Sequence, residues 1–334
     1  TSFTSILMKK KIAIIGSGIA GLTLANLLKQ NNNFEFLIYE KENSLNLEEG
    51  YGIQLSVNSV SILNKIGFLQ LNQNEKYNPS KLDFYSENSS KICDLDLTIF
   101  NSENEKYTTL KRSILIKFLK EKLPTNSLIF RKKIRKVIEK NKKISINFTD
   151  ETCEEVDYIV VSDGVFSNTK SIIEKKSFKP NYYGAHAIRT QVNAKDLSDF
   201  DSKNISLLMG SNFHIVLYPI NKNQEINLVC IIRQKSEKIQ DMKTILENII
   251  LKKKKNLVNL FKKDLKLWPI YTSNKTTKSI FNNVFYIGDA FYAFPPTMAQ
   301  GASQAIESAN EIFNLINDNC SNIQNLYFQN RLKR

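Results

Sequence analysis

A glycine-rich segment near the start of the chain places the strongest constraint on its fold. Gly16, Gly18 and Gly21 come after a mostly apolar segment, residues 11–15. A stretch with the hydrophobic periodicity of a helix continues from these glycines to about residue 30. A second apolar segment, residues 34–39, comes next. Strand, glycine turn, helix and strand form a βαβ unit, so the sequence predicts a parallel sheet.

The spacing of these glycines is typical of a dinucleotide site. Gly16 permits a tight turn, Gly18 lets the backbone approach a pyrophosphate at the helix N-terminus, and Gly21 allows helix and strand to pack closely. Glu40 ends the second strand, where its carboxylate can accept hydrogen bonds from ribose hydroxyls. We also expect Ile19, Ala20 and Lys41 to contact the dinucleotide. These residues do not distinguish FAD from NAD.

A second motif, late in the chain, favours FAD. An apolar strand ends in a Gly-Asp pair, a proline follows, and a further helix begins with a Gln-Gly-Ala sequence. Asp289 can bind ribityl hydroxyls, and the amides near Gly301 can face the electron-rich edge of a reduced flavin. The alternative is that the Gly-Asp pair is only a turn after a buried strand. The residues of this motif are Gly288, Asp289, Ala290, Pro296, Gln300, Gly301 and Ala302.

These motifs resemble those of the class A flavin-dependent aromatic hydroxylases, the family of para-hydroxybenzoate and salicylate hydroxylases, over nearly the whole chain. Asp163, Gly164 and Ser167 match the family's middle motif, whose Asp lies near the FAD pyrophosphate and is linked to NAD(P)H use. Arg112 matches the family arginine that contacts FAD. A loop beside the flavin corresponds to Gly52 and Ile53.

The sequence also departs from this family at three positions. Phe291 and Tyr292 replace the usual Ala-His, Lys170 stands where an arginine often follows the middle motif, and Ser162 occupies a position that is usually Ala. The change at Tyr292 leaves details of the flavin edge open.

The resemblance implies both a fold and a reaction. The fold is α/β, a Rossmann-type FAD-binding domain with an interleaved β-rich substrate domain, as in para-hydroxybenzoate hydroxylase. The reaction is reduction of FAD by NADH or NADPH, formation of a flavin C4a-hydroperoxide with O2, and hydroxylation of a small aromatic or heteroaromatic substrate. Because the flavin carries this chemistry, few side chains need be catalytic, and no metal is expected.

Hydrophobic periodicity predicts further elements along the chain. A helix is expected over residues 112–122, and strands over 127–130, 135–139, 144–148 and 158–161. A β-rich region follows, with strands at 186–192, 205–209, 214–219 and 226–232 and one or two helices after residue 240. A strand at 284–287 and a helix at 302–316 return to the first pattern.

This order predicts interleaved domains. Residues 8–75, 100–180 and 277–334 are assigned to the FAD-binding domain, residues 76–99 and 181–276 to the substrate domain, and residues 1–7 to an N-terminal extension.

Five residues are candidates for the reacting site: Pro296, Gly301, His214, Arg189 and Tyr292. His214 can transfer protons near neutral pH, although a histidine within a strand is more often structural. Arg189 can bind a substrate carboxylate or form a structural pair. Tyr292 can equally be a packing aromatic with its hydroxyl at the rim.

The net charge of +14 does not require an anionic partner, because an AT-rich coding sequence produces abundant Lys, Asn and Ile. Lysines 252–255 end a predicted helix, where they suit the helix dipole. No nucleic-acid motif accompanies them, and peripheral membrane contact stays an open, less favoured alternative.

Composition also bears on the compartment. Cys93, Cys153, Cys230 and Cys320 lie far apart without a neighbouring histidine, which argues against a zinc site or a dithiol pair and favours the cytoplasm. A lysine run before residues 12–28 imitates a signal peptide, but the glycine spacing argues otherwise. The sequence does not indicate the oligomeric state.

Two rivals to the hydroxylase interpretation stay open. The same fold can serve a reductase of isoprenoid double bonds or an oxidase. A cationic flavoprotein that acts only as a membrane-associated binding module is the second.

Overall fold

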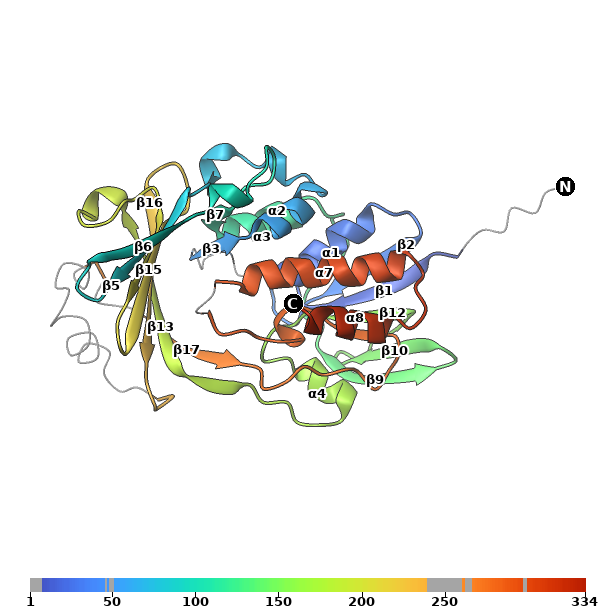
Figure 1. Cartoon of the computed structure of the whole chain (residues 1–334). Helices are drawn as coiled ribbons and strands as arrows, with labels where there is room; N and C mark the ends of the chain where they lie inside the picture. Colours follow the sequence, from blue (N-terminus) through green and yellow to red (C-terminus); the bar gives the residue numbers. More distant parts are fainter. Residues whose placement is uncertain (1–7, 46, 48–50, 239–259, 262–265, 297–298) are drawn as a thin grey trace.

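A five-stranded parallel sheet forms the centre of the first half of the molecule (Figure 1). Its order is β18-β12-β1-β2-β8. The bounds are β18 Val284–Tyr286, β12 Tyr158–Val161, β1 Lys10–Ile15, β2 Phe34–Tyr39 and β8 Leu128–Ile129. Strand β12 and the last four residues of β1 are apolar and mostly buried, as expected for a parallel sheet that is covered on both faces. This confirms the predicted parallel sheet.

The computed structural model describes residues 8–45, 47, 51–238, 260–261, 266–296 and 299–334. The proposed extension 1–7, the lysines 252–255 and most of the helical region predicted after residue 240 lie outside these ranges. Within them, no helix combines the length and apolar character that crossing a membrane requires.

Helix α1 (Ile19–Lys29) is buried over most of its surface, because α7 (Gly301–Asn317) packs along it and covers the side that the sheet leaves free (Figure 1). Only Ile19 and Lys29 of α1 are not fully buried. The other α-helices of the described residues are α2 (Val57–Asn64), α3 (Arg112–Glu121), α4 (Asn168–Glu174) and α8 (Ile323–Leu332). Helix α3 begins at Arg112, as the sequence predicted.

A three-stranded antiparallel sheet covers one side of this core. It comprises β9 (Ile134–Lys140), β10 (Lys143–Phe148) and β11 (Cys153–Val156), with β10 in the middle. Alternate residues of β10, namely Ile144, Ile146 and Phe148, are fully buried, which is the pattern of a sheet with one face on a core. The sequence predicted β9 and β10, but not β11.

The second half of the molecule is built on a seven-stranded sheet of order β17-β13-β16-β15-β14-β5-β6. Neighbouring strands are antiparallel except for β14 and β5. The bounds are β5 Lys81–Ser86, β6 Lys91–Asp96, β13 Asn181–Asn193, β14 Ile205–Met209, β15 Phe213–Pro219, β16 Glu225–Arg233 and β17 Leu267–Thr272. The chain thus enters this sheet twice.

A small sheet, β3 (Gly52–Leu55), β7 (Thr108–Lys111) and β4 (Lys76–Tyr77), joins the two halves. The backbone N–H of Gly52 donates to Asn227 Oδ1 of β16 at 2.8 Å, and the Thr109 hydroxyl donates to the carbonyl of Pro219 at the end of β15. Both bonds are buried, so breaking either leaves an unpaired polar group inside the protein.

Candidate functional site

The sequence motifs meet at the carboxyl edge of the parallel sheet. Ile15, the last residue of β1, lies opposite Val161 of β12 and Tyr39 of β2, and Val161 lies opposite Tyr286 of β18. Strands that end at the same level place the residues that follow them side by side. In open α/β sheets this edge is where ligands bind.

The first and middle motifs are in direct contact. Gly16 has φ +101°, and a Cβ there would lie 2.7 Å from the Ser162 carbonyl oxygen. A Cβ on Gly21 would lie 2.2 Å from the Gly16 carbonyl oxygen. The Ser162 hydroxyl donates to the Ile15 carbonyl at 2.9 Å and lies 3.1 Å from the Gly16 carbonyl. Ser162, noted above as a departure, therefore stabilises the glycine turn.

Glu40 is directed back toward the turn. Its Oε2 accepts hydrogen bonds from the backbone N–H and the hydroxyl of Ser17, at 3.0 and 2.6 Å. Its Oε1 accepts from the N–H of Glu42. Lys41, in contrast, is exposed and lies 3.9 Å from the Glu42 carboxylate. The structure thus brings Glu40, but not the Lys41 ammonium, toward the glycines.

Two carboxyl groups from the middle and late motifs face the same edge. Asp163 Oδ1 is buried and has no hydrogen-bond partner among the described residues, and burial raises the pKa of this carboxyl. Asp289 is exposed at the surface, yet desolvation by the surrounding protein raises the pKa of its carboxyl to about 6, and the nearby Arg112 opposes this shift. Gly288, beside it, has φ +58° and lies against Ala20 of α1.

An aromatic ring connects this edge to the seven-stranded sheet. The Tyr51 ring centre lies 5.8 Å from the guanidinium carbon of Arg112 and 4.5 Å from that of Arg189. Arg189 also lies 5.9 Å from the Trp268 ring. These distances allow cation–π attraction. Arg112, expected at the cofactor, and Arg189, expected at the substrate, therefore flank one side chain.

Arg189 shares a sheet face with His214 and Tyr218. The register pairs Arg189 with Val229, and Val229 with Val216, which lies between His214 and Tyr218 along β15. Gly52 packs against Tyr218 on this face, which is therefore the one turned toward the small sheet. The rest of the face is largely apolar and includes Ala187, Val216, Val229, Ile231, Trp268 and Ile270.

The two histidines differ. His214 Nε2 is buried without a partner among the described residues. Burial and then Arg233 lower the pKa of the ring, which favours the neutral imidazole. His186 is held by the Tyr182 hydroxyl at 2.9 Å and the Glu237 carbonyl at 3.0 Å. Its contacts are those of a structural residue.

The remaining predicted residues lie in the late motif and β3. Tyr292 packs on the core with its ring 4.8 Å from that of Phe294, and Ile53 is half-buried opposite Leu110. Pro296 precedes the undescribed residues 297–298, and Gln300, Gly301 and Ala302 begin α7. Of these, Ala302 packs on the core.

Sequence reasoning missed Tyr51 and Asn227. Tyr51 precedes Gly52 directly, and an aromatic residue beside a loop glycine is the one local indication that it had a role. Asn227 lies inside an apolar strand, and it is fully buried. A polar residue at such a position indicates a specific hydrogen-bond partner.

The chain is similar to a known family of flavin-binding proteins. The family model described as "FAD binding domain" matches residues 9–318. A 3-amino-4-hydroxybenzoate 2-monooxygenase of Streptomyces cremeus is 23% identical over 305 residues, which is 89% of this chain and 76% of the relative. A salicylate hydroxylase of Pseudomonas putida is 21% identical over 345 residues, which is 95% of this chain and 78% of the relative.

Solved structures show the same fold. HpxO of Klebsiella pneumoniae, complexed with FAD and uric acid, matches with a TM-score of 0.82 at 16% identity, covering 95% of this chain and 83% of that one. A salicylate hydroxylase substrate complex matches with a TM-score of 0.80 at 18% identity, covering 96% and 84%. The predicted para-hydroxybenzoate hydroxylase-like fold is confirmed.

The residues at this edge fit FAD. A Cβ built on Gly18, Gly164 or Gly301 would meet no atom of the described chain within 4 Å, so space is open along all three motifs. Asp163, directly before Gly164, has a buried Oδ1 without a partner among the described residues, and Asp289 adds a second carboxyl at the same edge. Amides at the start of α1 suit a pyrophosphate, and carboxylates suit ribose and ribityl hydroxyls.

Alanine at Gly21 and alanine at Gly18 should affect different properties of the protein, namely its stability and its affinity for FAD. Gly21→Ala forces a Cβ against the Gly16 carbonyl and should lower the free energy of unfolding of the flavin-free chain by about 1–3 kcal/mol. Gly18→Ala should leave that free energy unchanged within about 1 kcal/mol. It should nevertheless weaken FAD binding by about tenfold or more, about 1.4 kcal/mol. Urea unfolding and FAD titration measure both, and wild-type FAD affinity in Gly18→Ala would contradict the assignment.

Asp289 should make the flavin-free chain lose stability as the pH rises. The pKa of its carboxyl is about 6 in the folded chain and 3.8 ordinarily. Its favourable contribution to the free energy of unfolding is therefore complete below about pH 4 and is lost as the pH rises through 6. Asp289→Asn lacks this titration. The melting temperature of the variant relative to wild type should therefore increase from pH 4 to pH 7. A difference in melting temperature that stays constant over this pH range would exclude a raised pKa for Asp289.

Proposed function

The chain belongs to the FAD-binding domain family, and from this premise we propose that it is an FAD-dependent monooxygenase. It oxidises NADH or NADPH and uses O2 to hydroxylate a small aromatic or heteroaromatic substrate. The observation that carries the proposal is the position of Tyr51 between Arg112, next to Asp289, and Arg189 of the β-rich sheet.

The sheet face around Arg189 supports an aromatic acid as substrate. Apolar side chains from β13, β15, β16 and β17 offer a surface for a flat ring, and the half-buried Arg189 supplies a cation. A guanidinium can bind a carboxylate through two parallel hydrogen bonds. Salicylate and 3-amino-4-hydroxybenzoate, named in the relatives, combine an aromatic ring with a carboxylate.

Bound FAD would supply the redox chemistry, which is reduction by the nicotinamide coenzyme and transfer of one oxygen atom from O2. The chain's own residues bind and orient. Arg112 and Asp289, which are neighbours at the edge, would hold the cofactor, and Arg189 would position the substrate acid. The apolar face keeps water away from the reacting ring. His214 lies on the same sheet face, and its lowered pKa favours the neutral imidazole, the form that can accept a proton.

Oxygen incorporation tests the reaction. The FAD-loaded protein is given NADH or NADPH and a panel of hydroxylated benzoates and nicotinates under labelled O2. We expect coenzyme oxidation to accelerate with the correct substrate and one labelled oxygen atom to appear in the product. Reduction of a substrate without oxygen consumption would establish the reductase alternative, and oxidation of a substrate with O2 consumption but no label in its product would establish an oxidase. A protein that turns over nothing and binds anionic liposomes would establish the membrane module.

Arg189→Gln separates substrate binding from cofactor binding. Loss of the guanidinium should raise KM for a carboxylated substrate by about tenfold or more, since a charge-assisted hydrogen bond contributes about 1.5–3 kcal/mol. The FAD dissociation constant should stay within about twofold of wild type. A matched Arg135→Gln variant, altered at an exposed position of β9 outside the seven-stranded sheet, controls for general charge loss. An unchanged KM in Arg189→Gln would exclude carboxylate recognition by this residue.

A further inference from the structure

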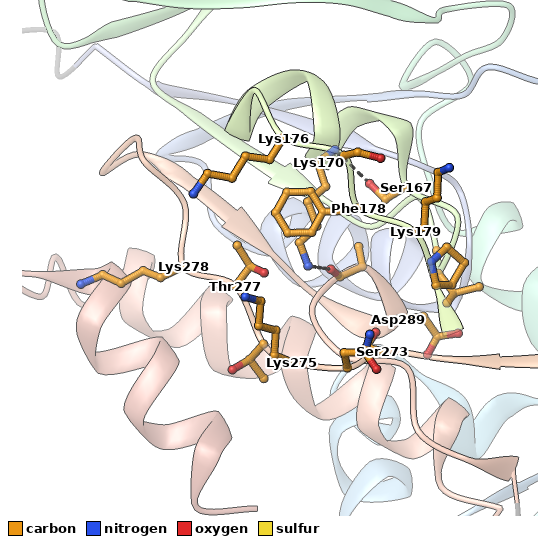
Figure 2. A pocket seen from close by; sticks show the side chains of 17 residues that line it. Ser167, Lys170, Lys176, Phe178, Lys179, Ser273, Lys275, Thr277, Lys278 and Asp289 are labelled. Atoms are coloured by element: carbon orange, nitrogen blue, oxygen red, sulfur yellow. Dashed lines mark hydrogen bonds between the residues drawn. The ribbon is translucent and has the colours of Figure 1, made fainter. Parts of the chain in front are cut away.

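A lysine-lined cavity lies next to the middle and late motifs and is not used by the chemistry described above (Figure 2). It encloses about 430 Å³, within the range of small-molecule sites. Its walls are residues 176–180, which follow α4, and residues 273–278, which follow β17. Gly164 and Asp289 also line it, so it opens onto the flavin motifs.

The charged side chains that line this cavity are almost all positive. Its lining includes five lysines, Lys170, Lys176, Lys179, Lys275 and Lys278, but a single carboxylate, that of Asp289. In the described part of the chain no salt bridge joins any of these lysines to an acid. Ammonium groups gathered around one concavity repel each other, and a bound anion would relieve that repulsion.

Lys170 differs from the other four. It is buried, its ammonium donates to the Ala290 carbonyl at 3.2 Å, and it lies 4.9 Å from the Phe178 ring and 5.2 Å from the Tyr286 ring. Burial lowers its pKa to about 8. Lys170 therefore ties the cavity wall to the late motif, and the four exposed lysines are the ones available to a ligand.

The exposed lysines are not evenly distributed. In Figure 2, Lys176 and Lys278 extend on the left of the cavity, Asp289 lies on the right with Ser273 near it, and Lys179 is drawn above Asp289. The Lys278 ammonium also contacts the Asn325 side chain of α8. A ligand that matches this arrangement carries most of its negative charge near Lys176 and Lys278 and directs an uncharged group toward Asp289, the single carboxylate of the lining.

We propose that this cavity binds the phosphates of the nicotinamide coenzyme and that its lysines make the protein prefer NADPH to NADH. The proposal rests on the proposed function, since it assigns the reductant's site. A pyrophosphate carries two negative charges, and the 2′-phosphate of NADPH adds about 1.5 to 2 more, which the four exposed lysines can balance. The nicotinamide then extends toward Asp289 and the flavin motifs.

Binding of the oxidised coenzymes tests this without turnover. FAD-loaded protein is titrated with NADP⁺ and NAD⁺ by calorimetry at one ionic strength, because screening weakens exposed charges. We expect NADP⁺ to bind about tenfold more tightly or better, and the double variant Lys176→Gln/Lys278→Gln to reduce that preference to about threefold or less. FAD affinity should be unchanged, because the glycine turn holds the flavin pyrophosphate.

The matched control is Lys136→Gln/Lys140→Gln, which removes two exposed lysines of β9 from outside the cavity. It should retain the preference for NADP⁺. Equal affinity for the two coenzymes in wild type, or the same loss in the control, overturns the proposal. Loss of FAD in place of NADP⁺ assigns the lysines to the flavin and overturns it as well.

The two proposals fail separately. If the lysine variants bind both coenzymes as wild type does while labelled oxygen still enters the product, the lysine site is wrong and the monooxygenase stands. If NADP⁺ binds in a lysine-dependent way but no labelled oxygen is incorporated, the monooxygenase is wrong and the coenzyme site stands.

Discussion

The pairing of β1 with β12, and of β12 with β18, is the constraint on which the rest of the site depends. These parallel strands end opposite each other at Ile15, Val161 and Tyr286. The turns that follow are consequently stacked so closely that a side chain on Gly16 would strike the Ser162 backbone. A slip of one residue in either pairing would reverse the side-chain faces and separate the motifs.

The second constraint is the junction between the two halves of the molecule. It depends on a few buried polar contacts, above all the Gly52 N–H with Asn227 Oδ1, and on the Tyr51 ring between two guanidinium groups. A junction of this kind has a defined geometry because a small displacement would leave polar groups buried without partners. It therefore fixes the distance between the cofactor edge and the face that carries Arg189.

Electrostatics divides the site into regions with different tasks. Asp163 and Asp289 place carboxyl groups with raised pKa values at the strand edge, next to space that suits hydroxyl groups. Arg112 and Arg189 lie on the side toward the β-rich sheet. The lysines of residues 176–179 and 275–278 rim the cavity beside α4. Part of the +14 charge of the chain is thus gathered around one concavity.

The sequence by itself determined the βαβ opening, the parallel sheet, the start of α3 at Arg112 and the family, because glycine spacing and apolar periodicity are local properties. It did not reveal β11, the pairing of β5 with β14, or the roles of Tyr51 and Asn227, because these depend on register between distant strands. The cofactor and substrate assignments of individual residues stay predictions. Only the tertiary structure decided that Arg112 and Arg189 flank one ring and that scattered lysines share a cavity, because such proximity arises when segments far apart in sequence fold together.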